Sequence, residues 1–330
     1  MKNDFVCIAC GSQAPPGIFC TAAERVVLEC IHCRLCKTER TQSAQLPDDL
    51  YGEHYFDGSH GYGQDYSGDF IREYDRQRFN EELSDLERIA AKGNILDVGC
   101  ATGNFLHAAQ LRGWRVFGYD ISEHAVRTVR TRIPGAVAES GKLGAATFNN
   151  EKFGVITLHH VLEHIEDPCV FLRETIFPLL KDDGLILLEV PNIASLEALA
   201  LRDQWEDLRP EQHLWHFTAK ALGLLVTKAG GKVLHCYTRG VPLWRTRLLP
   251  DYLWMFAARF LDIPYRGKVG RGGTPVAATA PGSVPSGTGV PGTTGRLRAF
   301  CKSIGTPVMS YINARNMGKR LVLIARKEIV

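Results

Sequence analysis

The stretch ILDVGCATGNF, residues 95–105, decides the fold of this chain. An apolar run ends at Asp97, and a loop with glycines at positions 99 and 103 then leads into a segment with helical spacing of apolar residues. Small loop residues allow a ligand to approach the backbone closely. We expect Asp97 to accept hydrogen bonds from a ligand ammonium group, while the loop N–H groups face its carboxylate. A methionyl group carries both charges.

A second acid follows the next apolar run. This run covers residues 116–119 and is followed directly by Asp120, where a carboxylate can hold both hydroxyls of a ribose. Dinucleotide-binding domains share such an acid, but their glycines follow the pattern GxGxxG. The loop here has the pattern Asp-x-Gly-x-x-x-Gly instead. The two signals together favour a nucleoside that carries a methionyl group over a dinucleotide.

Short apolar runs alternate with amphipathic stretches from residue 94 onward, which is typical of βαβ units and a parallel sheet. The expected strands cover residues 94–98, 115–119, 136–138, 155–159, 185–190, 232–237 and 320–326. We expect Ser122, Asp167 and Thr218 to cap helices that follow them, and a further helix over residues 69–91. The predicted fold class is α/β, with a Rossmann-like, doubly wound, mostly parallel seven-stranded sheet and helices on both faces.

Three segments precede or interrupt this pattern. Residues 1–40 contain six cysteines and are expected to form a small zinc-ribbon-like lobe, and residues 41–93 a connector with an N-terminal helix. The main domain then covers residues 94–330, with a flexible Gly/Pro-rich insertion at about 240–318. Two interpretations of the apolar and basic flanks of this insertion remain: helices packed on the domain, or a peripheral contact with a membrane surface.

Four stretches give the chain a family resemblance between residues 94 and 230. They are LDVGCATGNF from residue 96, GYDIS from residue 118, HHVLEHIEDP from residue 159 and DDGLILLEVPN from residue 182. With them the chain resembles the class I S-adenosylmethionine-dependent methyltransferases. The resembling branch includes ubiquinone-biosynthesis O-methyltransferases and enzymes that tailor sugars or secondary metabolites.

The resemblance implies the residues of a cofactor site. Those expected to bind S-adenosylmethionine are Asp97, Gly99, Cys100 and Gly103 near the methionine part, Asp120 at the ribose, Ile121 at the adenine, Glu139 or Ser140 near the adenine amine, and His159. Two positions depart from the family pattern. Ala101 replaces a loop glycine, and Gly154 stands where an acid is common.

A polar cluster follows the fourth strand of the domain. His160, Glu163 and His164 share one face if a helical turn forms there, and His213 follows the fifth strand. One interpretation makes His164 or His213 a general base that accepts a hydroxyl proton. A second assembles a divalent-metal site from all four residues, similar to the Glu-x-x-Glu-His arrangement of some ubiquinone-pathway and small-RNA methyltransferases. A third gives these residues only the task of ordering the turn.

The N-terminal cysteines form two Cys-x-x-Cys pairs. Four thiolates satisfy tetrahedral zinc, and lobes without a core need the metal to fold. We expect a structural zinc ion on Cys7, Cys10, Cys33 and Cys36, with Cys30 or His32 as rival ligands. No secretory signal precedes them, so a cytoplasmic location is expected and a disulfide framework is disfavoured.

Composition narrows the class of acceptor. A formal charge of +3 over 330 residues gives no concentrated basic character, so nucleic acid is an unlikely partner. The expected reaction is methyl transfer to an oxygen of a small molecule, such as a sugar, a lipid-linked saccharide or a quinol-like compound. Methylation of carbon or nitrogen, and a non-catalytic scaffold that binds the cofactor, are the alternatives. The oligomeric state stays open.

Overall fold

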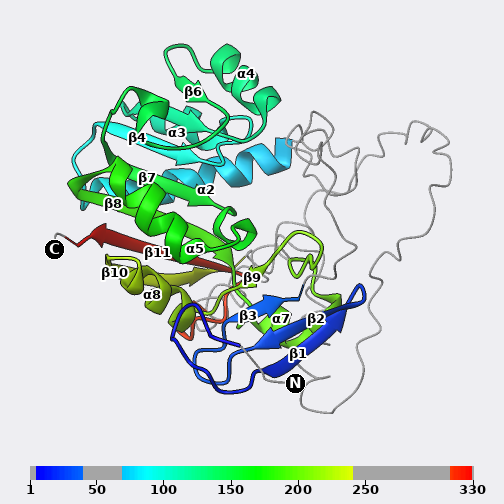
Figure 1. Cartoon of the computed structure of the whole chain (residues 1–330). Helices are drawn as coiled ribbons and strands as arrows, with labels where there is room; N and C mark the ends of the chain where they lie inside the picture. Colours follow the sequence, from blue (N-terminus) through cyan, green and yellow to red (C-terminus); the bar gives the residue numbers. More distant parts are fainter. Residues whose placement is uncertain (1–4, 40–68, 241–312, 329–330) are drawn as a thin grey trace, which may run out of the picture.

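A computed structural model of the chain describes residues 5–39, 69–240 and 313–328, and these residues form two β-sheets. The strands of the larger sheet, in spatial order, are β10 (Gly231–Arg239), β11 (Arg320–Lys327), β8 (Leu180–Pro191), β7 (Phe153–His159), β4 (Asn94–Val98), β5 (Arg115–Tyr119) and β6 (Val137–Glu139). Strands β4 to β8 run parallel, and β11 is antiparallel to both of its neighbours. The predicted Rossmann-like, mostly parallel, seven-stranded sheet is confirmed (Figure 1).

Helices connect these strands. They are α2 (Asp69–Glu87), α3 (Asn104–Leu111), α4 (Glu123–Arg132), η1 (Ala145–Phe148), η2 (Leu162–His164), α5 (Pro168–Val170), η3 (Phe171–Ile176), α6 (Phe177–Leu179), α7 (Leu196–Leu201), η4 (Arg202–Gln204) and α8 (Ala219–Lys228). Ser122, Asp167 and Thr218 cap α4, α5 and α8 as expected. Each side chain accepts a hydrogen bond from the N–H three residues later, at 3.3, 2.9 and 3.1 Å.

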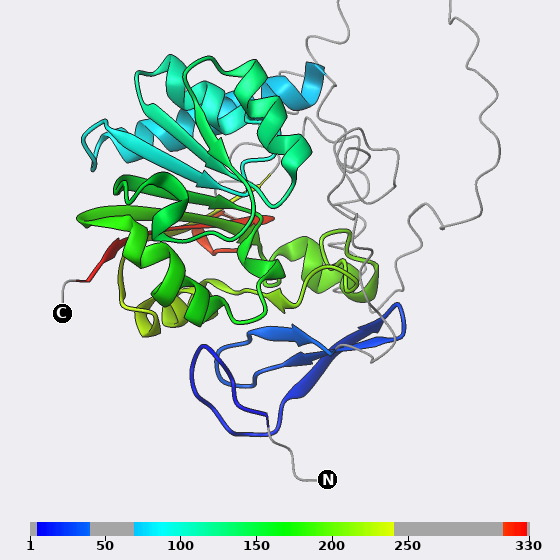
Figure 2. The same cartoon turned by 45° about the horizontal axis from the view of Figure 1, so that its top comes forward.

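Successive side chains of the central strands enter two separate cores, because side chains alternate across a strand. Ile95 and Leu187 pack in the core under α2, α3 and α4. Their neighbours Leu96 and Leu188 pack in the core under α5, α6 and α8. Helices therefore cover both faces of the sheet (Figures 1 and 2).

The smaller sheet belongs mostly to the N-terminal segment, which we call the cysteine lobe (residues 5–39). Its strands are, in spatial order, β1 (Gly17–Ala22), β2 (Arg25–Glu29), β3 (Cys36–Thr38) and β9 (Trp215–His216). The fourth strand thus comes from the larger part of the chain. The lobe lies beside α7 and α8 and shares a sheet with the segment that precedes α8 (Figure 1).

Two sequence predictions lie outside the described residues. They concern residues 41–68 of the connector and residues 241–312 of the insertion, with its proposed membrane contact. Among the helices of the described part, none combines the length and the apolar character that crossing a bilayer requires.

The end of α2 is joined to the start of β5 by one carboxylate. Glu87 accepts two hydrogen bonds from Arg112, at 3.0 and 2.6 Å, and one from Nε1 of Trp114 at 3.1 Å. The hydrogen bonds from Arg112, followed by that from Trp114, lower the pKa of Glu87 to about 2. Because this pKa lies below the ordinary 4.5, the pair stabilises the fold above pH 4.5 and the effect is lost as pH falls toward 2.

We expect Glu87→Gln to lower the free energy of unfolding by about 1 kcal/mol near neutral pH. The difference from the wild type should shrink toward zero in acid, which urea titrations at several pH values can measure. The matched control is Glu151→Gln, which removes the exposed pair with Arg115 and should change stability little. A deficit of Glu87→Gln that does not vary with pH would contradict this account.

Candidate active site

The loop between β4 and α3 has the backbone conformation that its glycines predict. Gly99 and Gly103 have φ angles of +77° and +85°, and a Cβ atom on Gly99 would lie 2.5 Å from Cγ2 of Val161. Ala101 also lies in the left-handed region, with φ +46°, although it has a Cβ atom. The departure from the family pattern at Ala101 is therefore accommodated with backbone strain of about 1 kcal/mol.

Several N–H groups of this loop are already paired within the protein. Those of Gly99 and Cys100 both donate to the carbonyl oxygen of Tyr119, at 2.7 and 3.0 Å. That of Gly103 donates to the carbonyl oxygen of Cys100. The prediction that the loop N–H groups face a ligand carboxylate is therefore wrong at these positions. The first N–H groups of α3, which have no acceptor within the helix, remain as donors.

Asp120 at the end of β5 ties two loops together. Its carboxylate accepts hydrogen bonds from the N–H groups of Ala101 and Ser122, at 2.8 and 2.9 Å. Burial raises the pKa of Asp120, and these two hydrogen bonds oppose the rise. Each carboxylate oxygen keeps a further lone pair for a ribose hydroxyl. The next residue, Ile121, is 66% exposed and so offers an apolar surface beside this carboxylate.

Asp97 at the end of β4 is held by two side chains of β7. Thr157 donates to its Oδ1 at 2.7 Å, and Nδ1 of His159 lies 3.3 Å from the same atom. The other ring nitrogen of His159, Nε2, lies 2.9 Å from Oε2 of Glu82 on α2. Both ring nitrogens therefore face carboxylates, and the geometry gives His159 the role of positioning Asp97.

His159 is a buried cation in this arrangement. Burial disfavours the imidazolium, but the charge of Glu82 and the hydrogen bonds to Asp97 and Glu82 outweigh it and raise the pKa of His159 to about 10. The ring also packs against Phe79 and Phe105, with centroids 5.4 and 4.9 Å away. This positive charge thus compensates Asp97 and, together with Arg239, Glu82.

The other residues expected at the cofactor lie at the same edge of the sheet. The N–H of Asp120 donates to the carbonyl oxygen of Glu139 at 3.3 Å, which brings the end of β6 beside Asp120. The Glu139 side chain pairs with Arg130 at 3.0 Å, and Ser140 follows it in the chain. Burial raises the pKa of Cys100 well above the ordinary value, so this thiol is neutral and packs in the core.

A second group of polar side chains brings together three of the predicted catalytic residues. One ligand atom each from Glu163, His164 and His213 lies within 4.8 Å of the others. The fourth, His160, bridges two buried acids: its Nδ1 lies 3.1 Å from Oε1 of Glu163, and its Nε2 lies 3.2 Å from Oε1 of Glu189. Oε2 of Glu163 is buried and has no hydrogen-bond partner among the described residues.

Backbone carbonyl groups orient the two imidazoles of this cluster. Nδ1 of His164 lies 3.3 Å from the carbonyl oxygen of Gln212, and Nδ1 of His213 lies 2.8 Å from that of Asp207. A carbonyl only accepts, so the proton of each neutral ring is on Nδ1 and its lone pair is on Nε2. Burial is the main cause that lowers the pKa of both His164 and His213. Both rings are therefore neutral and able to accept a proton or bind a cation.

Three charged residues of the site were not predicted. Glu82 contacts His159 and also pairs with Arg239 of β10 at 2.9 Å, and Glu189 of β8 contacts His160. A signal for Glu189 was present, because an acid stands inside the apolar run LILLEVP. Glu82 lies on a helix rich in charged residues, where nothing in the sequence separates it from its neighbours.

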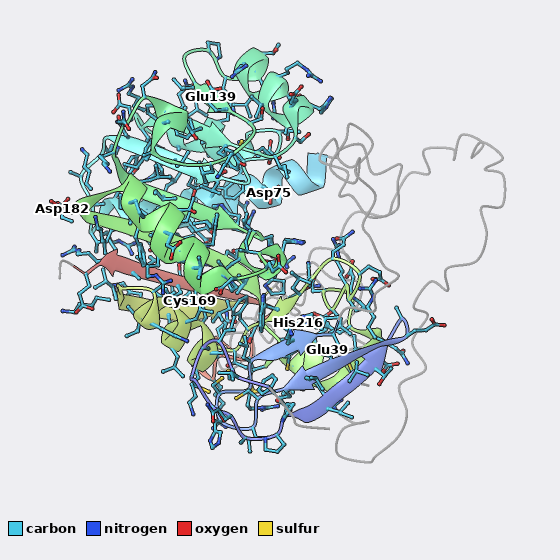
Figure 3. The ribbon with its side chains drawn as sticks, viewed as in Figure 1. Glu39, Asp75, Glu139, Cys169, Asp182 and His216 are labelled. Atoms are coloured by element: carbon cyan, nitrogen blue, oxygen red, sulfur yellow. The ribbon has the colours of Figure 1, made fainter. Side chains whose placement is uncertain are left out.

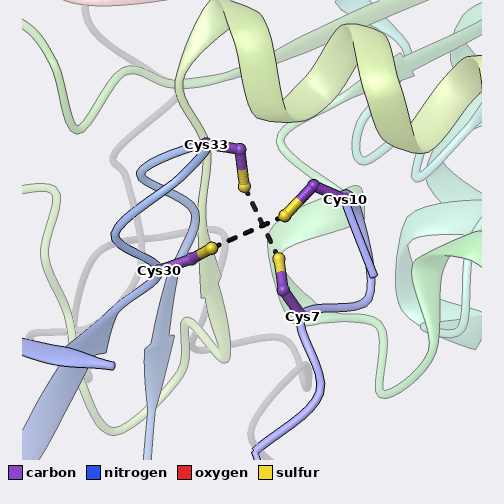
Figure 4. A group of neighbouring side chains, drawn as sticks. All are labelled: Cys7, Cys10, Cys30 and Cys33. Carbon is purple, nitrogen blue, oxygen red and sulfur yellow. Dashed lines mark hydrogen bonds between the residues drawn. The ribbon is translucent and has the colours of Figure 1, made fainter. Parts of the chain in front are cut away.

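The thiols of the cysteine lobe converge on one point (Figure 4). Sγ of Cys7 lies 3.5 Å from that of Cys33, and Sγ of Cys10 lies 3.6 Å from that of Cys30. Tetrahedral zinc with bonds of about 2.3 Å needs sulfur atoms about 3.8 Å apart. The donor set and its spacing therefore fit a structural zinc ion.

Cys36 is not part of this group. It lies in β3, and its thiol donates weakly to the carbonyl oxygen of Arg34 at 3.7 Å. The predicted ligand set is corrected at this position, since Cys30 takes the place of Cys36. His32, the other rival, is exposed and absent from the group.

Known proteins are similar in sequence to parts of this chain. The profile of a family described as methyltransferase domain matches residues 71–236, half of the chain. The ubiquinone biosynthesis O-methyltransferase of Caulobacter vibrioides is 32% identical over 142 residues, which cover 40% of this chain and 53% of that protein. That of Haemophilus ducreyi is 32% identical over 107 residues, which cover 30% and 45%. The chain spans about half the length of these curated relatives.

A solved structure is also similar. It is described as a SAM-dependent methyltransferase from Archaeoglobus fulgidus, and it matches with a TM-score of 0.45 and 15% identity. The match covers 82% of this chain and 97% of that one.

The first prediction from this geometry concerns His159. Because its pKa is raised from 6.5 to about 10, its stabilising effect is complete below pH 6.5 and is lost as pH rises through 10. We expect His159→Gln to lower the free energy of unfolding by about 3 kcal/mol at neutral pH, because buried Asp97 loses its cation and Glu82 keeps only Arg239. Denaturant titrations between pH 6 and about 10 should show a loss of stability for the wild type that the variant lacks.

His107→Gln is the control for this experiment, because His107 is an exposed histidine of α3. It should behave like the wild type at every pH. If His159→Gln unfolds with the wild-type pH profile, then His159 is not the buried cation described above.

A second prediction separates the two candidate ligand sets of the cysteine lobe. Purified wild-type protein should hold about one zinc ion per chain. Cys30→Ser should lose most of this zinc because it removes one of four thiolates, whereas Cys36→Ser should retain it. Metal analysis by mass spectrometry measures both variants. Loss of zinc from Cys36→Ser alone would restore the ligand set expected from the sequence.

Proposed function

The chain belongs to the methyltransferase domain family and is an S-adenosylmethionine-dependent methyltransferase, and from this premise we propose that it methylates an oxygen of a small molecule. Sugars, lipid-linked saccharides and quinol-like compounds are the acceptor classes. The observation that carries the proposal is the cluster of Glu163, His164 and His213, which we call the acceptor cluster; Oε2 of Glu163 has no partner among the described residues, and both rings are neutral. Such groups suit the removal of a hydroxyl proton.

The cofactor-binding half of the site is formed by the two acids at the ends of β4 and β5. Asp97 is placed for the ammonium of the methionine part and Asp120 for the ribose, while Ile121 offers an apolar surface to the adenine. Bound S-adenosylmethionine supplies an electrophilic methyl group on sulfur. The segment from His159 to His164 then leads from Asp97 to the acceptor cluster.

The acceptor cluster handles the proton of the reaction. Methyl transfer would form a bond from the acceptor oxygen to the methyl carbon, break the bond from that carbon to sulfur and release S-adenosylhomocysteine, so the acceptor has to lose its hydroxyl proton. The hydroxyl proton moves to Nε2 of His164 or His213, which carries the lone pair. Oε2 of Glu163 stabilises the imidazolium that forms. Positioning of acceptor and cofactor supplies much of the remaining rate enhancement.

A divalent cation is the specific alternative at this cluster. Two imidazole nitrogens and one carboxylate within 4.8 Å of one another are a donor set that such ions accept. The ion would lower the pKa of a bound hydroxyl or diol, and Glu163, His164 and His213 would hold it. The relatives named for ubiquinone biosynthesis support oxygen as the acceptor atom, over the alternatives of carbon, nitrogen or a scaffold without turnover.

We expect Glu163→Gln to reduce turnover by about 100-fold to 10,000-fold, because the carboxylate that supports proton removal is lost. Release of S-adenosylhomocysteine should be measured with ortho-diphenols and with free and lipid-linked sugars. Calorimetry should show that the affinity for S-adenosylhomocysteine stays within about twofold of the wild type. Glu166→Gln, a change at an exposed neighbour, is the matched control and should keep full activity.

Removal of metal with a chelator distinguishes a histidine general base from a bound divalent cation. After dialysis against chelator, a cation site regains its activity with Mn²⁺, an ion that a thiolate site disfavours, whereas a metal-free base does not respond to Mn²⁺. Binding of the cofactor without turnover on any acceptor class would overturn the proposed enzyme activity and favour a scaffold. Equal activity of Glu163→Gln and Glu166→Gln would remove the acceptor cluster from the mechanism.

A further inference from the structure

The cysteine lobe and the acceptor cluster are joined by one short strand. Strand β3 of the lobe pairs with β9, so that Cys36 lies opposite His216 and Lys37 opposite Trp215. The pairing continues at the N–H of Thr38, which donates to the carbonyl oxygen of Leu214 at 2.9 Å. His213, the residue immediately before Leu214, is a member of the acceptor cluster.

The same peptide segment is attached to Glu163 on its other side. The N–H of Leu214 donates to the carbonyl oxygen of Glu163 at 2.9 Å. Leu214 therefore receives a hydrogen bond from the lobe and donates one to the acceptor cluster. A displacement of β3 would move Leu214, and with it both Glu163 and His213.

Side chains strengthen the connection. Oγ1 of Thr38 lies 2.9 Å from Nε2 of His216, and both residues are buried. The His216 ring lies 6.2 Å from the His213 ring, between centroids. Figure 3 shows His216, which belongs to β9, where the lobe meets the larger part of the chain. Nε1 of Trp215 donates to the carbonyl oxygens of Ile165 and Glu166, which follow the cluster in sequence.

The turn that carries part of the four-cysteine cluster is hydrogen-bonded to the start of α8. Oγ1 of Thr218 donates to the carbonyl oxygen of Cys33 at 2.9 Å, and Nζ of Lys220 donates to that of His32 at 2.7 Å. Cys33 is one of the four converging thiols, and β3 begins three residues after it. The position of β3 thus depends on the preceding turn, which contains two of the four clustered cysteines.

We propose that the metal-loaded cysteine lobe is a positioning element of the acceptor cluster, with Thr38 and His216 as the residues that transmit its position to His213. This inference rests on the proposed function, since it assigns the lobe to the acceptor half of that site. The cofactor half is excluded from the coupling, because Asp97 and Asp120 are held by Thr157, His159 and backbone groups of the larger domain.

The test uses the full chain with ¹⁵N-labelled histidine, in the wild type and in Thr38→Val, Thr38→Ser and Thr21→Val. Thr38→Val removes the hydroxyl and keeps the shape, so the ring signals of His216 and His213 should shift and turnover should fall about tenfold. Thr38→Ser retains the hydroxyl and should restore both. Thr21→Val, an exposed change on β1 at the far edge of the lobe, should alter neither.

Metal removal is the second arm. The double variant Cys7→Ser with Cys10→Ser should lose the zinc and shift the same histidine signals, while calorimetry finds the affinity for S-adenosylhomocysteine within about twofold of the wild type. If this variant does not fold, Thr38→Val still decides, because it leaves all four thiols intact and its zinc content can be measured.

The outcomes are separable. Histidine signals that stay unchanged in Thr38→Val would overturn the inference, and so would an equal loss of cofactor affinity, since that would make the lobe a general support of the fold. If the signals shift as expected but no acceptor is methylated by the wild type, then the proposed function fails while the positioning of His213 by the lobe stands.

Discussion

The buried imidazolium of His159 is the interaction on which this edge of the sheet depends. It lies between Asp97 of β4, which would otherwise be a buried charge without a cation beside it, and Glu82 of α2. Arg239 of β10 pairs with the second oxygen of Glu82. Charge pairing therefore fixes α2 and three strands relative to one another, and Asp97 is held in one orientation.

The two halves of the site differ in how far their polar groups are satisfied. On the cofactor side, Asp97 and Asp120 have their partners before any ligand arrives. On the proposed acceptor side, Oε2 of Glu163 is buried and has no partner in the part of the chain that the structure describes, and burial keeps His164 and His213 neutral. Unsatisfied buried groups are costly and are retained at functional sites. This contrast supports the proposal that one half binds the cofactor and the other handles the proton.

The sequence predicted the parts of this arrangement that depend on local patterns. The seven strands, the caps at Ser122 and Thr218, and the acids beside the glycine loop follow from periodicity and spacing. Glu82 was not found, because nothing in the sequence of α2 reveals which side chain will reach the strand edge. The ligand set was wrong at Cys36 because residues 30, 33 and 36 have equal spacing, and only the start of β3 removes the last from the group.

The cysteine lobe also depends on the larger domain for its core. Phe19 and Val27 of the lobe pack in one cluster with Trp205 and Leu208, which lie between β8 and β9 in the chain. A lobe of this size has little apolar surface of its own to bury. It therefore needs both the four clustered cysteines and this shared hydrophobic cluster to stay folded. The segment with Trp205 and Leu208 leads directly to His213, so the segment that completes the core of the lobe also carries one member of the acceptor cluster. Folding of the lobe and placement of the acceptor-side histidine are, on this argument, one event.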